Sequence, residues 1–160
     1  MFGKQSAYLA SQERLADLIA AIQAMGSYRY SSRRVKKWEQ ILKKPRSASS
    51  WDVVFNEHPE FFRASSREDG EHQLVLRRAQ NKVYDTDTGK EITVRDYFSQ
   101  DEKGQSRISR KPLSAEQIIS LVEVAIKLQN QAVTYNQEVR YRIPLLMGLL
   151  GVLLGALLKS

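Results

Sequence analysis

The feature that most constrains this chain is the apolar run at its C-terminal end. Residues 143–158 read IPLLMGLLGVLLGALL and contain no charged or strongly polar side chain. A helix that is apolar on every side has no face suited to water, so the run predicts a transmembrane anchor. At roughly 1.5 Å per residue, about 16 residues cover only about 24 Å of a hydrocarbon core near 30 Å. Arg140, Tyr141, Arg142 and Lys159 are therefore expected at the membrane interface.

A buried core helix is the alternative interpretation of this run, because apolar stretches of this length also occur inside globular domains. If the run spans a bilayer, the cations before it predict a cytoplasmic N-terminal domain, since nearly all Lys and Arg residues precede it. The expectation is a tail-anchored, single-pass protein of a bacterial inner membrane, with Pro144 at a kink or helix break. Gly148, Gly151 and Gly155 share one face and predict close packing of two such helices.

The composition limits the number of domains and the kinds of site and partner that this chain can have. The chain has 160 residues, which is enough for one compact domain with appended elements. It has no Cys and two His, which excludes disulfide scaffolds and thiolate zinc sites. A formal net charge of +7 favours polyanionic partners such as nucleic acid or acidic lipid.

No catalytic motif stands out in the sequence. It lacks a phosphate-cradling Gly loop, a nucleophile elbow and metal-ligand spacing, so no enzyme activity, cofactor or metal is expected. The stretch from Asp85 to Gly89 superficially resembles a calcium loop, but it lacks the later ligands and predicts a plain turn.

Apolar periodicity predicts three helices in the first part of the chain, after a loosely ordered stretch at 1–10. The first helix follows Ser11 and stops at Gly26, and the second ends before Pro45. The third is barely two turns, between Ser49 and Pro59. Residues 61–77 then predict a β-hairpin with its turn at 69–70, and residues 83–93 a second hairpin.

Three helices followed by a hairpin resemble the winged-helix variant of the helix-turn-helix fold. The resemblance covers roughly residues 11–79 and rests on element order, not on a motif. It implies an α+β winged-helix-like domain over residues 11–93. The predicted fold is this domain, then a polar linker at 94–112, a long helix at 113–142 and the anchor at 143–158.

The long helix carries a second apolar pattern. Its start is predicted at Ser114, where Leu113, Gln117 and Ile118 complete a capping box and a hydrophobic staple. An apolar seam with alternating steps of three and four follows, and its predicted oligomerisation residues are Leu121, Ala125, Leu128 and Ala132. The seam packs either on the domain's own core or on a second copy in a coiled coil.

A basic cluster is the main functional clue. Between residues 29 and 46 it contains one acid, Glu39, and the cations Arg29, Arg33, Arg34, Lys36, Lys37, Lys43, Lys44 and Arg46. The winged-helix resemblance implies that these cations border a duplex backbone. It also implies that Ser49, Ser50 and Asn56 face base edges and that Arg67 reaches phosphate from the wing. A solvated basic face, or one resting on anionic lipid, is the alternative.

The third helix offers Asp52 and Glu57 but little with which to read bases, so contact driven by phosphate is expected. The leading hypothesis is a tail-anchored oligomer that brings a polyanion, nucleic acid or a nucleotide signal, to the membrane. One alternative is an oligomerising membrane effector that perturbs the bilayer when its domain senses a trigger. Another is a membrane-anchored scaffold for a protein partner.

Overall fold

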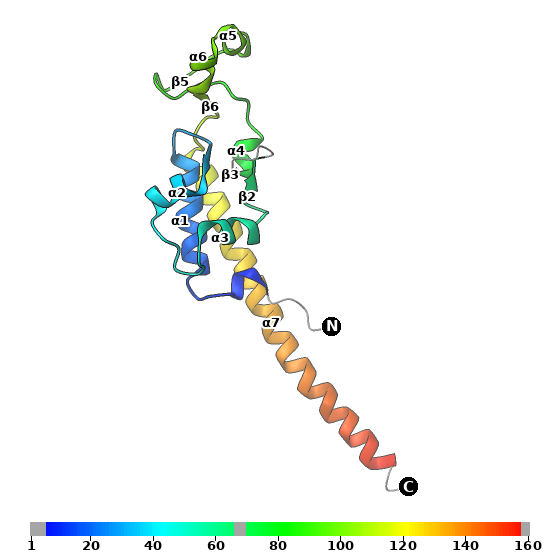
Figure 1. The fold of residues 1–160 in the computed structure, drawn as a ribbon. Coiled ribbons are helices and arrows are strands. Elements are labelled where there is room, and N and C mark those ends of the chain that lie inside the picture. The colour runs from blue at the N-terminus through cyan, green and yellow to red at the C-terminus, as the bar shows by residue number, and fades with distance from the viewer. Residues whose placement is uncertain (1–5, 66–69, 158–160) are drawn as a thin grey trace.

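The computed structural model describes residues 6–65 and 70–157, with side chains as far as residue 140 and that of Pro144. It has a body of short helices and strands, from which one long helix extends (Figure 1). The helices are η1 (Ala7–Leu9), α1 (Arg14–Ser27), α2 (Val35–Leu42), α3 (Trp51–Glu57), α4 (Val75–Arg78), α5 (Val94–Ser99), α6 (Glu102–Ser106) and α7 (Ala115–Leu157). The strands are β1 (Ser32–Arg34), β2 (Phe62–Ala64), β3 (Glu71–Leu74), β4 (Tyr84–Asp85), β5 (Lys90–Glu91) and β6 (Ile108–Ser109).

The strands form two small antiparallel sheets, which makes the described chain α+β. In the first sheet β3 lies between β1 and β2, with Ser32 opposite Gln73 and Phe62 opposite Leu74. In the second sheet β4 lies between β5 and β6. The three predicted helices and the hairpin occur in the expected order, and β1 is an addition between α1 and α2.

The core forms where α1 meets α7. Leu18, Ile22 and Met25 recur on one face of α1 and are fully buried, as is Ala125 of α7. Gly26 allows α1 and α7 to approach each other closely, because a Cβ at this position would lie 2.9 Å from Cγ1 of Ile118. Helix α1 ends at Ser27, one residue beyond the predicted end at Gly26. Gly26 lies within α1 and makes room for α7.

The start of α7 follows the predicted signal. Oγ of Ser114 accepts a hydrogen bond from the backbone N–H of Gln117, and Oε1 of Gln117 accepts one from the N–H of Ser114. Leu113 is buried in the core and Ile118 packs against it. The backbone N–H of Leu113 also bonds the carbonyl of Gly26, which fixes the entry of α7 beside α1.

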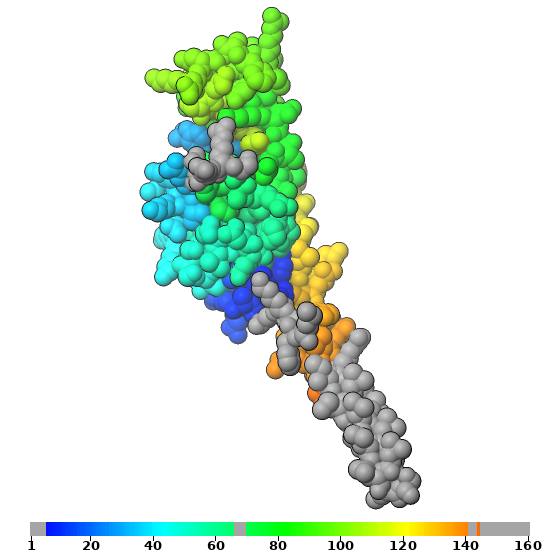
Figure 2. Space-filling view, turned by 45° about the vertical axis from the view of Figure 1, so that its right-hand side comes forward, coloured from blue at the N-terminus to red at the C-terminus, as the bar shows by residue number. Residues whose placement is uncertain are grey.

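The segment predicted as a polar linker, residues 94–112, contains regular structure instead. Thr93 and Asp96 form a complete capping box at α5, and Asp101 caps α6 by accepting from the N–H of Gly104. Strand β6 then pairs with β4. Figure 2 shows this part of the chain stacked on one end of the body, with α7 leaving the other end.

The structure contradicts the predicted transmembrane anchor. In the part of the chain that is described, no helix is both long enough and apolar enough to cross a membrane. Residues 143–157 of the run are the end of α7, which continues from a polar stretch and passes through Pro144 without ending there. At about 24 Å the run is also shorter than a hydrocarbon core of about 30 Å.

The predictions that depended on a transmembrane anchor are wrong for the same reason. The tail-anchored, single-pass topology, the inner-membrane location and the cytoplasmic placement of the domain are corrected on the same finding. Arg140 is an exposed residue of α7, and the side chains of Tyr141, Arg142 and Lys159 lie outside the described residues.

A buried cation, Arg77 of α4, joins the end of α1 to the segment that precedes α7. The Arg77 side chain is fully buried and donates hydrogen bonds to the carbonyls of Met25 at 2.9 Å, Tyr28 at 2.6 Å and Lys111 at 3.1 Å. Burial, and then the charge of Arg110, lowers the pKa of Arg77 to about 10, so it stays protonated at neutral pH. Backbone carbonyls thus replace a carboxylate as the partners of this charge.

We expect Arg77→Met to lower the free energy of unfolding by at least about 3 kcal/mol, because several buried carbonyls would lose their donor at once. The measurement is urea unfolding of the full chain followed by circular dichroism. Arg78→Met, the same change at the exposed neighbouring position, is the control and should shift the midpoint little. Equal midpoints for the two variants would contradict a structural role for Arg77.

Candidate functional site

The structure divides the predicted basic cluster and gathers part of it around a hollow. Arg33 and Arg34 of β1 and Lys37 in the first turn of α2 line a hollow of about 450 Å³. Its other lining residues are Tyr30, Ser32 and Glu71. Three cations of the sequence cluster therefore surround one concave surface.

A second hollow, of about 460 Å³, adjoins the first. It shares Tyr30, Ser32 and Glu71 with the first hollow, and it adds the cations Arg78, Lys82 and Arg110. Its remaining lining residues are Ser31, Ser65, Gln73, Ser106, Ile108 and Ser109. We call the two hollows together the basic groove, the first being its open half and the second its enclosed half.

The pairing of distant segments builds this groove. Glu71 of β3 lies opposite Arg34 of β1, and the Ser32 hydroxyl donates to the Glu71 carboxylate at 3.0 Å. The backbone N–H of Ser31 donates to Oγ of Ser109 at 2.9 Å, which joins β6 to the start of β1. Residues 78 positions apart therefore meet at the floor of the groove.

The groove is strongly positive. Glu71 is the one acid among its described lining residues, against three cations in each half. Within the described ranges, no carboxylate is recorded within 4.0 Å of the cationic groups of Arg78, Lys82 or Arg110. Burial, and then the charge of Arg78, lowers the pKa of Arg110. These like charges are suited to an anion that would lie between them.

Aromatic rings lie among the cations of the open half. The guanidinium of Arg33 is 4.8 Å from the centre of the Tyr28 ring, and that of Arg29 is 5.1 Å from the Tyr30 ring. Tyr30 lines both halves of the groove and is half-buried. The groove thus offers a flat ring surface beside its cations.

The other predicted cations lie elsewhere. Lys36 is exposed on α2 but does not line the groove, while Lys43, Lys44 and Arg46 follow the opposite end of α2. Lys43 has a positive φ of 63°, and its carbonyl accepts a hydrogen bond from the Trp51 indole. The sequence cluster is therefore two spatial groups.

The third helix offers little for reading bases. The Asn56 amide donates to Asp52 at 3.0 Å, and Glu57 pairs with the buried Arg14 at 2.6 Å. Ser49 is exposed, and Ser50 precedes α3 without a side-chain cap bond. Arg67, predicted at the wing tip, lies outside the described residues.

The predicted seam of α7 meets the chain's own core. Ala125 is fully buried, and Leu121 and Leu128 pack against the core cluster, while Ala132 is half-buried. This matches the intramolecular alternative for the seam. The surroundings of Gly148, Gly151 and Gly155 lie outside the described residues, so helix association there stays a prediction.

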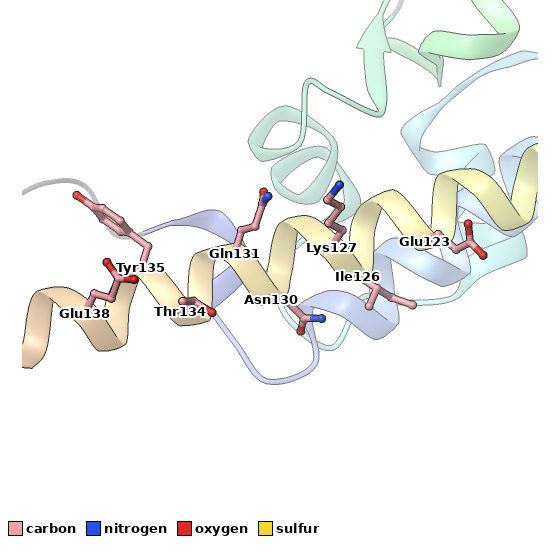
Figure 3. Close-up of a pocket in the computed structure, with 8 residues that line it drawn as sticks. All are labelled: Glu123, Ile126, Lys127, Asn130, Gln131, Thr134, Tyr135 and Glu138. Carbon is pink, nitrogen blue, oxygen red and sulfur yellow. The ribbon is translucent and has the colours of Figure 1, made fainter.

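A further hollow, of about 590 Å³, runs along α7 alone. Figure 3 shows its lining side chains along this single helix: Glu123, Ile126, Lys127, Asn130, Gln131, Thr134, Tyr135 and Glu138. Their polar groups diverge around the helix instead of facing one point. This surface lacks the convergent groups that a binding site needs.

A polar cluster of Tyr8, His58 and Glu60 ties η1 to the turn after α3. The Tyr8 hydroxyl donates to the Glu60 carboxylate, and Nδ1 of the buried His58 lies 3.0 Å from it. Burial alone would raise the pKa of Glu60, but the hydrogen bonds to His58 and Tyr8 outweigh it and lower the pKa. These three residues line none of the hollows described above, and their contacts hold η1 against the turn after α3.

Sequence reasoning missed Arg78, Lys82 and Arg110, because the fold brings them to β1 from far along the chain. The described residues also hold no group of three His, Asp or Glu side chains placed to bind a metal ion. The Asp85 carboxylate accepts the backbone N–H of Asp87 at 2.9 Å and so belongs to the turn itself. Comparison with family models, with curated proteins and with solved structures finds no match.

We expect Glu60 to contribute stability that is present above about pH 4.3, the ordinary value for Glu, and that is lost as the pH falls through its lower folded pKa. Glu60→Gln should flatten the acid side of a plot of unfolding midpoint against pH. Glu123→Gln, at an exposed position on α7, is the control and should keep the native slope. An unchanged slope in Glu60→Gln would contradict the assignment.

Proposed function

We propose that this protein binds a nucleic-acid strand through the basic groove, chiefly by its phosphates. The observation that carries the proposal is the adjacency of the two hollows around Tyr30, with three cations in each half and a single acid between them. Lys and Arg side chains on one concave surface neutralise successive phosphates and release counterions. The excess positive charge of the whole chain, +7, acts in the same direction.

The geometry favours a single strand over a duplex. A duplex is read by an element that projects into its major groove, whereas the cations here surround a hollow. Tyr30 provides a ring on which a base or sugar can stack beside Arg29, whose guanidinium lies over the same ring, while Arg33 lies over the Tyr28 ring. Cations beside aromatic rings are typical of surfaces that follow a single strand.

Binding of this kind is largely independent of base sequence. The exposed side of α3 carries Asp52, which would repel phosphate if α3 faced the nucleic acid, and Glu57, whose carboxylate is already paired with Arg14. Asn56 is already hydrogen-bonded to Asp52. The proposal therefore places the nucleic acid on the side of β1 and α2, away from the helix that the winged-helix resemblance had implied.

We expect the double variant Arg33→Gln, Lys37→Gln to weaken binding of a labelled single-stranded RNA by roughly tenfold or more at low salt. Each phosphate contact contributes about 0.7 to the slope of log K against log salt, so the slope should fall by about 1.4. The measurement is fluorescence anisotropy over a salt series with the full chain.

Lys43→Gln, Lys44→Gln is the matched control, because it removes the same charge from the same sequence cluster but outside the groove. It should change affinity and slope far less than the groove variant. Equal losses in the two double variants would mean that net charge alone attracts the RNA, and the groove would not be the site. No binding by the native chain at low salt would overturn the function itself.

A further inference from the structure

The enclosed half of the groove has the features of a discrete ligand pocket. Its volume of about 460 Å³ falls within the range of roughly 300–1,000 Å³ that is usual for small-molecule sites. It lies where the first sheet, α4 and the segment around β6 meet, so walls from three parts of the chain surround it. The open half, by contrast, is formed at β1 and the start of α2 with Glu71 of β3.

Two guanidinium groups of this pocket are held by backbone carbonyls. Nε of Arg110 donates to the carbonyl of Gln80 at 3.0 Å, and Nη1 of Arg78 lies 3.5 Å from the carbonyl of Ala64. Each group keeps further N–H donors, since a guanidinium has five. Lys82 adds a third cation at the same pocket. The pocket therefore presents several donors and concentrated positive charge to one ligand.

The lining of the pocket also contains hydrogen-bond acceptors. Gln73 is 6 % exposed and lines the pocket, and its Oε1 has no hydrogen-bond partner. A buried acceptor without a partner costs free energy, and because this oxygen is closed to solvent, the Gln73 amide must turn toward the pocket before a ligand can donate to it. The Glu71 carboxylate is a second acceptor in the same lining. Glu71 already accepts a hydrogen bond from the Ser32 hydroxyl, and its carboxylate has further lone pairs for donors of a ligand.

We infer that the enclosed half binds a phosphate monoester on a hydroxyl-bearing sugar, namely the 5′-phosphorylated end of an RNA strand. Arg78 and Arg110 hold the phosphate, while Gln73 and Glu71 accept hydrogen bonds from sugar hydroxyls. This rests on the proposed function for the rest of the strand, which continues through Tyr30 into the open half. A monoester carries about −1.5 to −2 charges near neutral pH, more than the single charge of an internal diester.

The decisive comparison uses two RNA strands of identical sequence, one with a 5′-phosphate and one with a 5′-hydroxyl group. We expect the full chain to bind the 5′-phosphorylated strand at least about tenfold more tightly in fluorescence anisotropy, because charge-assisted hydrogen bonds are worth that much. The advantage should shrink between pH 7.5 and pH 5.5, as the phosphate loses its second charge near about pH 6. Ribose 5-phosphate should compete for the advantage more strongly than inorganic phosphate.

Substitutions test whether the pocket causes the preference for the 5′-phosphorylated strand. Arg110→Gln should weaken the 5′-phosphorylated strand more than the 5′-hydroxyl strand, so that the two strands bind with nearly equal affinity. Arg33→Gln, Lys37→Gln should weaken both strands by a similar factor and keep the preference. Circular dichroism establishes that each variant is folded, and Arg110→Lys, which keeps the charge, should retain part of the preference.

The outcomes separate this inference from the proposed function. Equal affinity of the native chain for the two strands would overturn the inference and leave nucleic-acid binding in place. Binding of ribose 5-phosphate without measurable binding of either RNA would overturn the proposed function and the strand end as ligand, and would leave a sugar-phosphate site. A preference that survives in Arg110→Gln would show that the 5′-phosphate lies elsewhere, which also overturns the inference.

Discussion

The buried guanidinium of Arg77 is the interaction on which the rest of this structure depends. It bonds carbonyls at the end of α1, in the turn toward β1 and in the segment before α7, and so fixes three stretches that are far apart in sequence. A buried charge costs several kcal/mol unless hydrogen bonds compensate it, so these stretches are held together or the charge is left unpaired. The groove borders this junction: Arg78 is the next residue of α4, and Arg110 provides one of the bonded carbonyls. Stability and the arrangement of the groove thus have a common origin.

Local sequence patterns predicted the elements whose signals are local. The apolar spacing along α1, the two short helices that follow and the capping box at Ser114 all depend on residues a few positions apart. β1 could not be predicted in this way. Its three residues, Ser32–Arg34, are polar and extend only because β3 pairs with them. The predicted linker at 94–112 fails for a different reason. Its polar composition hid two N-terminal caps, at Thr93 and Asp101, which begin short helices that bury no apolar side chain.

The candidate site was predictable only in part, for a similar reason. Charge density along the sequence drew attention to Arg33, Arg34 and Lys37, which line the open half of the groove, but it could not separate them from Lys43 and Lys44. About six residues of helix, or about 9 Å, divide the two groups. Arg78, Lys82 and Arg110 are isolated cations in the sequence and join the groove through strand pairing and the bond from Ser31 to Ser109. The membrane prediction was wrong for another reason. The apolar composition of the C-terminal run predicted a lipid environment, but the run belongs to the long helix α7, and no described helix is long and apolar enough to cross a membrane.

The division of the cations bears on how a basic surface gains selectivity. Outside the groove, Arg46 lies 3.8 Å from Glu13, and such exposed charges attract any polyanion weakly because water and salt screen them. Within the groove, cations from β1, α2, α4 and the segment after β6 line two adjoining hollows, where the surrounding protein lowers the effective dielectric below that of bulk water. Electrostatic attraction strengthens as the effective dielectric falls. The same number of charges therefore acts more strongly, and on a more narrowly defined ligand, where the fold has made the surface concave.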